Sequence, residues 1–319
     1  MKLKILLLYS FVSLVSIHAK DANSGDPRTV YVVTWNVAEK DPPGSVRELL
    51  GQVSDKSEVN PDIIIVGLQE LTMNPIIASA NAVLKDKWST AIDGILKSKN
   101  NYHKVNSESL LGILLNVYVK IKYKDSIEDK KDTTVKTGFK GMSGNKGAVI
   151  LRFKLNGKQY CIVNSHLPAH DDKLEERIED YKTINKERAK VCNNPSSDYI
   201  FWLGDLNFRL DESLNNQTIH DKIKQGKFAE LLTKDQLKVN KETQEIFTNF
   251  KEEKITFRPT FKLEKDTGEY SPKRRPAWTD RVLYKSNTGK KITNTLYKSI
   301  ENYKQSDHFP VQAQFYLDN

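Results

Sequence analysis

The sequence predicts an α/β fold in which two β-sheets pack face to face and helices lie outside them. Short apolar segments rich in β-branched and aromatic residues alternate with longer polar or amphipathic segments. The 319 residues include 38 % hydrophobic and 29 % charged residues, a globular composition with enough apolar side chains for a core. No internal repeat and no linker rich in Pro, Gly or Ser divides the chain, so we expect one domain over residues 28–319.

Eight segments have the length and residue types of strands. They cover residues 30–35, 63–68, 111–118, 148–153, 160–163, 199–203, 281–284 and 311–316. Three longer segments, residues 74–97, 173–192 and 221–230, are predicted to be helices. Residues 121–136 are highly charged, and we expect an exposed hairpin or loop there.

The charge and cysteine content restrict the function classes. With 50 Lys+Arg against 41 Asp+Glu, the formal net charge is +9, which favours anionic partners such as nucleic acid, phospholipid head groups or phosphorylated small molecules. The only cysteines are Cys161 and Cys192, which excludes a multi-cysteine zinc or iron–sulfur site and a disulfide-dense scaffold. Their spacing leaves open whether they pair.

The N-terminal residues have the pattern of a cleavable secretory signal over residues 1–19. Lys2 and Lys4 precede an apolar run over residues 5–17, and residues 16–19 resemble a cleavage site. The run is shorter than the roughly 20 residues of a membrane-spanning helix. A short anchor or a buried helix is the alternative, but we expect a secreted protein. The glycosylation sequon at residues 216–218 agrees with secretion.

Polar side chains at five strand ends are the candidates for a functional site. They are Asn36, Glu70, His166, Asp205 with Asn207, and Asp307 with His308. Active sites gather on loops held by rigid strands, so we expect these groups to lie together. Taken singly, each Asn or Asp has the alternative role of a turn former, and each His that of a structural residue.

These residue types support metal-assisted attack of water on a phosphate ester. Carboxylate oxygens are the ligands that Mg²⁺ prefers, and the candidates are Glu70, Asp280 and Asp307. Asp205 can orient or deprotonate the water, while histidines donate to the phosphate oxygens. A Cys-x₅-Arg loop, a serine nucleophile elbow and a Walker loop are absent from the sequence, so nothing suggests a covalent intermediate.

Seven segments resemble the catalytic domain of inositol polyphosphate 5-phosphatases, in the order of that family and along nearly the whole chain. They are TWNV at 34–37, GLQE at 67–70, GNKG at 144–147, NSHL at 164–167, WLGDLNFR at 202–209, PAWTDRVL at 276–283 and SDHFP at 306–310. The two longest are the most specific. The family belongs to the endonuclease/exonuclease/phosphatase superfamily, so the resemblance implies a sandwich of two mixed sheets flanked by helices.

The resemblance implies a monomeric, Mg²⁺-dependent phosphatase that removes the 5-phosphate from inositol phosphates or phosphoinositides such as phosphatidylinositol 4,5-bisphosphate. It implies that Glu70 binds the Mg²⁺, with Asn36 beside it and Asp307 near the metal. The expected partners are this substrate and, peripherally, a membrane surface; nucleic acid is not expected.

The resemblance also assigns the catalytic roles. Asp205 activates the attacking water, and Asn207 helps to position the water and the phosphate. His308 and His166 contact the scissile phosphate, while Asp280 orients the ring of His308.

Substrate-binding roles follow from the same resemblance for cations near a second ring phosphate. Lys146 and Arg275 match such positions, and the basic run at 273–275 is expected on an anion-facing loop. Met142 stands where the family often has Lys or Arg, so Lys140 is a candidate substitute. His170 is a candidate contact at the rim.

Two other functions are compatible with the same fold. The first is a nuclease or sphingomyelinase of the superfamily, against which the segments at 144–147 and 276–283 argue. The second is a secreted haem and nitric oxide carrier, since one type of similar protein in the saliva of blood-feeding bugs carries haem on a cysteine thiolate. That function needs an accessible cysteine, whereas Cys161 lies in a predicted strand and residues 36–110 contain none.

Overall fold

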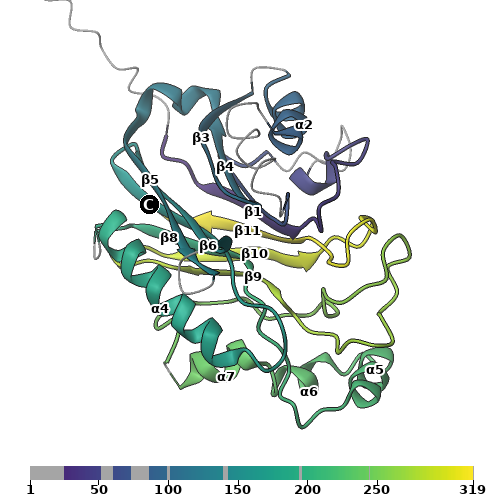
Figure 1. The fold of residues 1–319 in the computed structure, drawn as a ribbon. Coiled ribbons are helices and arrows are strands. Elements are labelled where there is room, and N and C mark those ends of the chain that lie inside the picture. Colours follow the sequence, from purple (N-terminus) through teal and green to yellow (C-terminus); the bar gives the residue numbers. More distant parts are fainter. Residues whose placement is uncertain are drawn as a thin grey trace, which may run out of the picture.

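The structure is a computed structural model that describes residues 25–51, 60–72, 86–98, 101–138, 143–193, 196–243 and 245–318. Two mixed β-sheets face each other, with helices on their outer sides (Figure 1). This arrangement confirms the predicted fold class.

The first sheet has the strand order β10-β11-β1-β2-β4-β3. Its strands are β1 (Thr29–Asn36), β2 (Ile63–Gln69), β3 (Tyr102–Leu110), β4 (Ile113–Lys120), β10 (Ile292–Ser299) and β11 (Val311–Leu317). The pair β1 and β2 is parallel and its neighbours are antiparallel. The carboxyl ends of β1 and β2 therefore meet at one edge of the sheet.

The second sheet has the order β5-β6-β7-β8-β9. Its strands are β5 (Ile127–Thr137), β6 (Ser143–Leu155), β7 (Lys158–His166), β8 (Tyr199–Asp205) and β9 (Asp280–Lys285). Here β7 and β8 are the parallel pair. As in the first sheet, two neighbouring strands deliver their carboxyl ends to the same edge.

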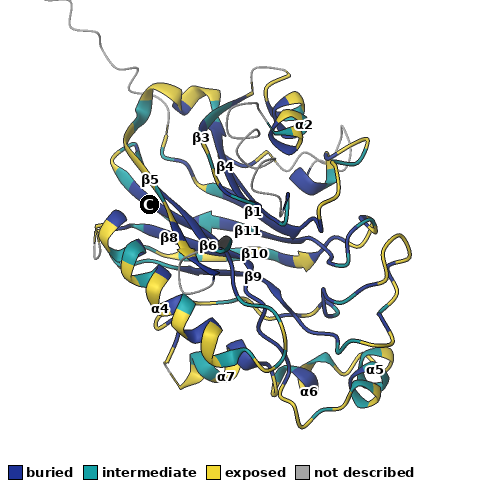
Figure 2. Cartoon of the chain, viewed as in Figure 1, coloured by how far each residue is buried: buried dark blue, intermediate teal, exposed yellow. Residues whose placement is uncertain are grey.

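The buried apolar residues form three clusters, one between the two sheets and one on the outer face of each sheet. Figure 2 shows that the central strands of both sheets are largely buried. Within β2, Ile63 and Ile65 face the layer between the sheets, and Ile64 and Val66 face the outer layer. Because successive side chains of a strand point to opposite faces, an unbroken apolar run marks a strand that is buried on both faces. The outer layer of the first sheet is completed by η1 (Glu48–Leu50) and α2 (Lys87–Leu96).

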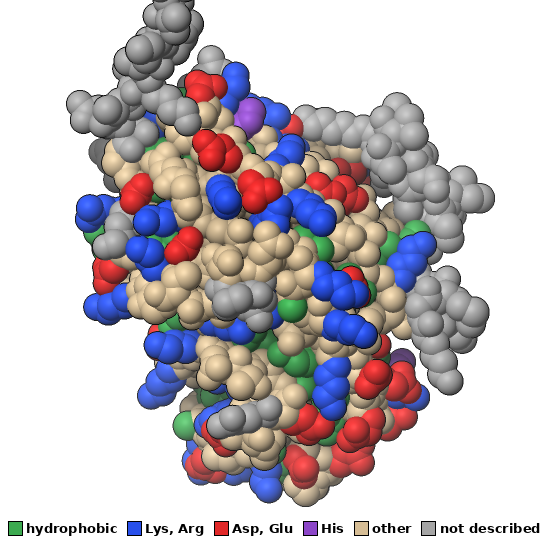
Figure 3. Space-filling view, turned by 90° about the vertical axis from the view of Figure 1, so that its left-hand side faces the viewer, with side chains coloured by type: hydrophobic (Ala, Val, Ile, Leu, Met, Phe, Trp, Pro, Cys, Tyr) green, Lys and Arg blue, Asp and Glu red, His purple; other side chains and the backbone are tan. Residues whose placement is uncertain are grey.

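The outer face of the second sheet is covered by α4 (Leu174–Val191) and α7 (Gln236–Glu242). The remaining helices are η2 (Ile121–Ser126), α5 (Asn216–Lys224) and α6 (Phe228–Leu232). On the face that carries α4 and the C-terminus, basic and acidic side chains are interspersed (Figure 3). Within the described ranges, no helix is long and apolar enough to cross a bilayer.

The structure contains each of the eight predicted strands and differs from the predictions for two other segments. Residues 121–136 are not a hairpin or loop but η2 followed by β5, an exposed strand at the sheet edge. The predicted helix at 221–230 is two helices, α5 and α6. The described part of the helix predicted over 74–97 contains α2, and residues 73–85 lie outside the described residues. Three elements were not predicted, namely strands β3 and β10 and helix α7. Their sequences are rich in polar residues and lack a clear apolar periodicity.

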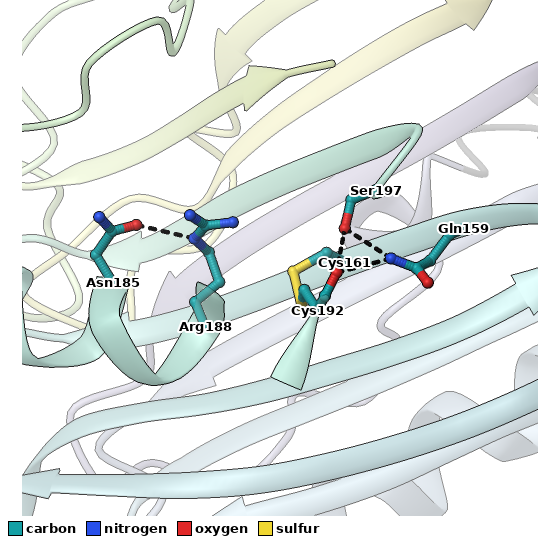
Figure 4. Close-up of a disulfide and its surroundings, with 6 residues drawn as sticks. All are labelled: Gln159, Cys161, Asn185, Arg188, Cys192 and Ser197. Carbon is teal, nitrogen blue, oxygen red and sulfur yellow. Dashed lines mark hydrogen bonds between the residues drawn. A yellow bond between two sulfur atoms is a disulfide. The ribbon is translucent and has the colours of Figure 1, made fainter. Parts of the chain in front are cut away.

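A disulfide between Cys161 and Cys192 joins β7 to the C-terminal end of α4 (Figure 4). The carbonyl of Cys192 accepts from Gln159 Nε2 at 2.7 Å and from Ser197 Oγ at 2.8 Å. Both cysteines of the chain are used in this bond, so the chain has no free thiol.

Candidate active site

Strand register aligns four residues across the second sheet. Gly147 on β6 pairs with His166 on β7, His166 pairs with Asp205 on β8, and Asp205 pairs with Asp280 on β9. This row places an imidazole and two carboxylates side by side. Gly204 has a φ of 141°, and a Cβ there would lie 1.9 Å from the carbonyl oxygen of Ser165, so only glycine lets β8 lie this close to β7.

The first sheet contributes Asn36 and Glu70 to the same site. Asn36 ends β1, and its Nδ2 donates to Asp205 Oδ2 at 3.0 Å, which links the two sheets. Glu70 follows β2 directly, and its left-handed backbone (φ 55°) turns the chain out of the sheet. Its Oε1 lies 3.7 Å from His166 Nε2, and its side chain is 31 % exposed, so it borders both the buried site and solvent.

Gly67, three residues before Glu70, packs tightly against side chains of the second sheet. A Cβ at Gly67 would lie 2.7 Å from Leu203 Cδ1 and 2.8 Å from the side-chain Oδ1 of Asn164. Asn164 also accepts from Gln69 Nε2 at 2.7 Å. The tight packing at Gly67 and the buried hydrogen bond between Gln69 and Asn164 therefore connect the two sheets next to the site.

His308 and Asp280 form a buried pair. His308 Nδ1 lies 2.9 Å from Asp280 Oδ2, and the same oxygen accepts from Thr260 Oγ1 at 2.7 Å and from Thr279 Oγ1 at 2.9 Å. The other ring nitrogen of His308, Nε2, lies 3.9 Å from Asp205 Oδ2. Asp280 is therefore held so that it fixes the His308 ring with Nε2 toward Asp205.

The ionisation of the site follows from this arrangement. Burial alone would lower the pKa of His308, but the Asp280 and Asp205 carboxylates outweigh it and raise that pKa to about 9. Burial alone would raise the pKa of Asp205, but His308, His166 and Lys146 outweigh it and lower that pKa. At neutral pH the site therefore contains a His308 imidazolium next to an Asp205 carboxylate.

Lys146 lies inside the site rather than at its rim. Its Nζ is 2.5 Å from His166 Nε2, which in turn lies 3.4 Å from Asp205 Oδ2. Burial lowers the pKa of Lys146, and the Asp205 and Glu70 carboxylates oppose that effect. A half-buried cation therefore lies where an anionic substrate group would approach these carboxylates.

Asn207 is fully engaged by the protein. Its backbone N–H donates to Asp205 Oδ1 at 3.1 Å and its Nδ2 donates to the carbonyl of Leu167 at 3.0 Å. Its Oδ1 accepts from Arg209 Nη2 at 2.5 Å. Asn207 therefore joins the chain that leaves β8 to the chain that leaves β7, and Arg209 is a site residue that the sequence reasoning missed.

The oxygen donors of the site suit a hard divalent cation. Glu70 Oε1 and Asp205 Oδ2 lie within 3.7 and 3.4 Å of the same His166 nitrogen, so two carboxylates border one space. Asp205, Asp280 and His308 also offer one ligand atom each within 4.8 Å of one another, although Asp280 Oδ2 already accepts from two threonines. Asp307, by contrast, has its carboxylate 2.6 Å from Lys262 Nζ.

The predicted rim residues have different surroundings. Arg275 donates to the carbonyls of Leu210 and Asp211, at 3.0 and 2.6 Å, so its guanidinium braces a loop. His170 is exposed. Lys140 and Met142 lie outside the described residues.

Arg274 is a cation that the sequence reasoning placed only within a basic run. Its guanidinium lies 5.9 Å from the centre of the Phe261 ring, and that ring lies 4.7 Å from the ring of His308. Lys262 lies on the same ring at 5.5 Å. The basic run at 273–275 indicates that an arginine lies near the site. It does not indicate which one, because the backbone conformation of the loop decides which of the two neighbouring arginines faces the site.

Residues 33–314 match the model of endonuclease/exonuclease/phosphatase family 2. The type II inositol 1,4,5-trisphosphate 5-phosphatase of Mus musculus is 36 % identical over 89 % of this chain, and inositol polyphosphate 5-phosphatase K of the same species is 32 % identical over 96 %. These matches span 29 % and 69 % of the two relatives, so the chain covers less than a third of the length of the first.

The solved structures that are similar to this chain include two with different bound molecules. The inositol polyphosphate 5-phosphatase domain of SpSynaptojanin, in complex with inositol (1,4)-bisphosphate and calcium ion, has a TM-score of 0.76 and 29 % identity, over 91 % of this chain and 84 % of that one. The Cimex nitrophorin ferrous NO complex has a TM-score of 0.77 and 28 % identity, over 92 % and 100 %. The chain thus belongs to the inositol polyphosphate 5-phosphatases of the endonuclease/exonuclease/phosphatase family.

Proposed function

We propose that this protein is a Mg²⁺-dependent phosphatase that removes the 5-phosphate of inositol phosphates or phosphoinositides. The observation that carries the proposal is the buried Asp205 carboxylate, which lies between two histidines and accepts a hydrogen bond from Asn36 of the other sheet. The family relationship and the inositol (1,4)-bisphosphate in the SpSynaptojanin domain support this substrate class.

In the proposed reaction Asp205 accepts the proton of the attacking water. Its low pKa keeps it ionised, and Asn36 fixes the carboxylate orientation through its bond to Oδ2. The His308 imidazolium, oriented by Asp280, donates from Nε2 to a non-bridging phosphate oxygen, where negative charge must be stabilised. The Lys146 ammonium, whose Nζ lies beside His166 Nε2, supplies a further donor to the phosphate, and His166 borders the same space.

Glu70 and the Asp205 side of the site would hold the Mg²⁺, which supplies Lewis-acid stabilisation of phosphate oxygens. Asp307 is ion-paired with Lys262, so we assign it to the loop around the site, with an electrostatic effect on the neighbouring His308. The calcium ion in the SpSynaptojanin complex supports a divalent cation in this family.

For the second ring phosphate we assign Arg274 in place of Arg275. Arg274 lies over Phe261 next to His308, whereas the Arg275 guanidinium is committed to backbone carbonyls. A guanidinium suits phosphate because it presents paired N–H groups.

The test is phosphate release from soluble inositol phosphates, short-chain phosphoinositides and DNA, each with and without EDTA. We expect Mg²⁺-dependent release from an inositide and none from DNA. Failure to release phosphate from any inositide would refute the proposal, and cleavage of DNA alone would favour a nuclease.

We also propose that the protein is secreted. The signal-like residues 1–19 support this, as does the Cys161–Cys192 bond, because disulfides persist in oxidising compartments. Detection of the processed chain in the medium of expressing cells, with a mature N-terminus near residue 20, tests it. Retention of the full-length chain inside the cells would contradict it.

The likeness to Cimex nitrophorin raises the carrier function again. A haem bound through a cysteine thiolate needs a free cysteine, and both cysteines of this chain form the disulfide. We therefore prefer the phosphatase.

A further inference from the structure

Arg177 is a buried cation outside the active site whose surroundings call for an explanation. It lies in the first turns of α4 and is 0 % exposed. Its guanidinium forms hydrogen bonds to three backbone carbonyls and one side-chain amide, all of them neutral acceptors. Burying a charge is costly in free energy unless the charged group is well hydrogen-bonded. The positions of these four acceptors therefore indicate the structural role of the Arg177 side chain.

Three of the acceptors belong to the segment that leaves β7. Arg177 Nη1 donates to the carbonyls of Pro168 and His170, at 3.0 and 2.7 Å. Its Nη2 donates to the carbonyl of Asp171 at 3.3 Å. This segment begins directly after His166, so the guanidinium holds the chain that follows one of the site histidines.

The fourth acceptor connects Arg177 to the segment that leaves β8. Arg177 Nη2 donates to Gln236 Oε1 at 2.8 Å, and the same oxygen accepts from the backbone N–H of Arg209 at 2.9 Å. Arg209 Nε donates to the carbonyl of Asn207 at 3.0 Å, and the N–H of Asn207 donates to Asp205 Oδ1 at 3.1 Å. The bonds form a continuous series from α4, through the first residue of α7, to the proposed water activator.

We propose that Arg177 is a positioning residue that fixes the segments following β7 and β8 against each other and thereby sets the separation of His166 and Asp205. These two side chains lie 3.4 Å apart. A planar guanidinium can serve acceptors on two segments at once, whereas an ammonium is a compact point charge. Only the kinetic part of the test rests on the proposed phosphatase function.

A purely electrostatic role is the competing explanation, since Arg177 also places a positive charge near Asp205. The variant R177K distinguishes the positioning role from the electrostatic role, because lysine keeps the positive charge but lacks the planar guanidinium that donates to two segments at once. We expect R177K to lower kcat about 10- to 100-fold with little change in KM, as for a misplacement of reacting groups. Wild-type kcat in a folded R177K protein would overturn the proposal.

The matched control is R188K. Arg188 lies on the same helix and is 2 % exposed, but its Nε donates only to Asn185 Oδ1, at 2.9 Å (Figure 4). Its Nη1 has no hydrogen-bond partner. R188K therefore measures what the loss of a buried arginine from α4 costs in melting temperature, and we expect its kcat to equal that of the wild type. An equal loss of kcat in R188K would contradict a specific role for Arg177.

Hydrogen exchange gives a readout that does not need activity. We expect R177K to speed amide exchange in peptides covering residues 166–172 and 205–210. Q236A should speed exchange only in the peptide covering 205–210, and R188K should speed exchange in neither peptide. If the wild type hydrolyses no inositide, the proposed function fails while this pattern still decides the role of Arg177. If R177K does not fold, Q236A carries both readouts, and unchanged kcat and exchange in Q236A would overturn the proposal.

Discussion

The floor and the rim of the active site are built in different ways. The floor consists of strand-end side chains such as Asp205, His166 and Asp280, which are at most 1 % exposed and tied to one another by register and hydrogen bonds. The rim consists of loop residues such as Arg274 and His170, which have partial or full solvent exposure. The floor can therefore hold groups to the fraction of an ångström that bond chemistry needs, while the rim can vary to recognise a substrate.

Loss of the central carboxylate should have the largest effect. We expect Asp205→Asn to lower kcat by about 10³-fold or more, because the general base is removed while the floor keeps its shape. The exposed carboxylate of Asp211 gives the control, and Asp211→Asn should keep wild-type kcat. A folded Asp205→Asn protein with wild-type turnover would show that Asp205 in the floor is not the general base.

The next effect is a pH dependence that depends on Asp280. With a pKa of about 9, His308 is protonated below that pH, so kcat should fall as the pH rises through 9. The raised pKa also means that this group's contribution to stability is complete below about pH 6.5 and is lost as the pH rises through 9. Asp280→Asn should move the alkaline limb of the kcat profile to lower pH. An unmoved limb would assign it to another group.

A rim substitution should change binding more than turnover. We expect Arg274→Ala to raise KM about 10-fold for substrates with a second ring phosphate, with a smaller change in kcat, because one charge-assisted phosphate contact is lost. Arg275→Ala should instead lower the melting temperature, since that guanidinium braces the carbonyls of Leu210 and Asp211. The reverse pattern would exchange the roles of the two arginines.

The disulfide lies away from both regions and should leave activity almost unchanged. Replacing Cys161 and Cys192 by Ala should lower the free energy of unfolding by about 2–4 kcal/mol, as expected for a disulfide that closes a loop of this size. The sequence separation is 31 residues. Denaturant unfolding and kcat at 25 °C measure the two effects, and a large loss of kcat would indicate that the bond also supports the floor.

The floor was predictable from the sequence and the rim was not. Asn36, Asp205 and His166 end buried apolar strands, so their positions follow from periodicity and from the rule that parallel strands end at one edge. Arg274 and Arg275 are adjacent on a loop, and no periodicity distinguishes the arginine that faces the site from the one that binds backbone carbonyls. The ion pair of Asp307 with Lys262 was also not predictable, because the two residues are 45 positions apart in the sequence.

The edge strands were not predicted because few of their side chains are buried. Strand β5 has an almost wholly exposed charged sequence, so neither alternation nor an apolar run marks it, and its pairing with β6 alone makes it a strand. The polar network of Arg177 was also hidden, because a buried arginine on an amphipathic helix has the same sequence signature as an exposed one.

The packing of Gly67 against side chains of the second sheet limits how this protein can be improved by engineering. Enlarging core side chains is a common way to raise melting temperature, but a Cβ at Gly67 would lie within 2.8 Å of Leu203 and Asn164 side-chain atoms, and we expect the shift that relieves this contact to lengthen the Asn36–Asp205 hydrogen bond. Thermostability and turnover should therefore trade against each other at this end of the sandwich. Stabilising substitutions are better sought at the opposite strand ends, where the thickness of the core and the spacing of reacting groups are independent.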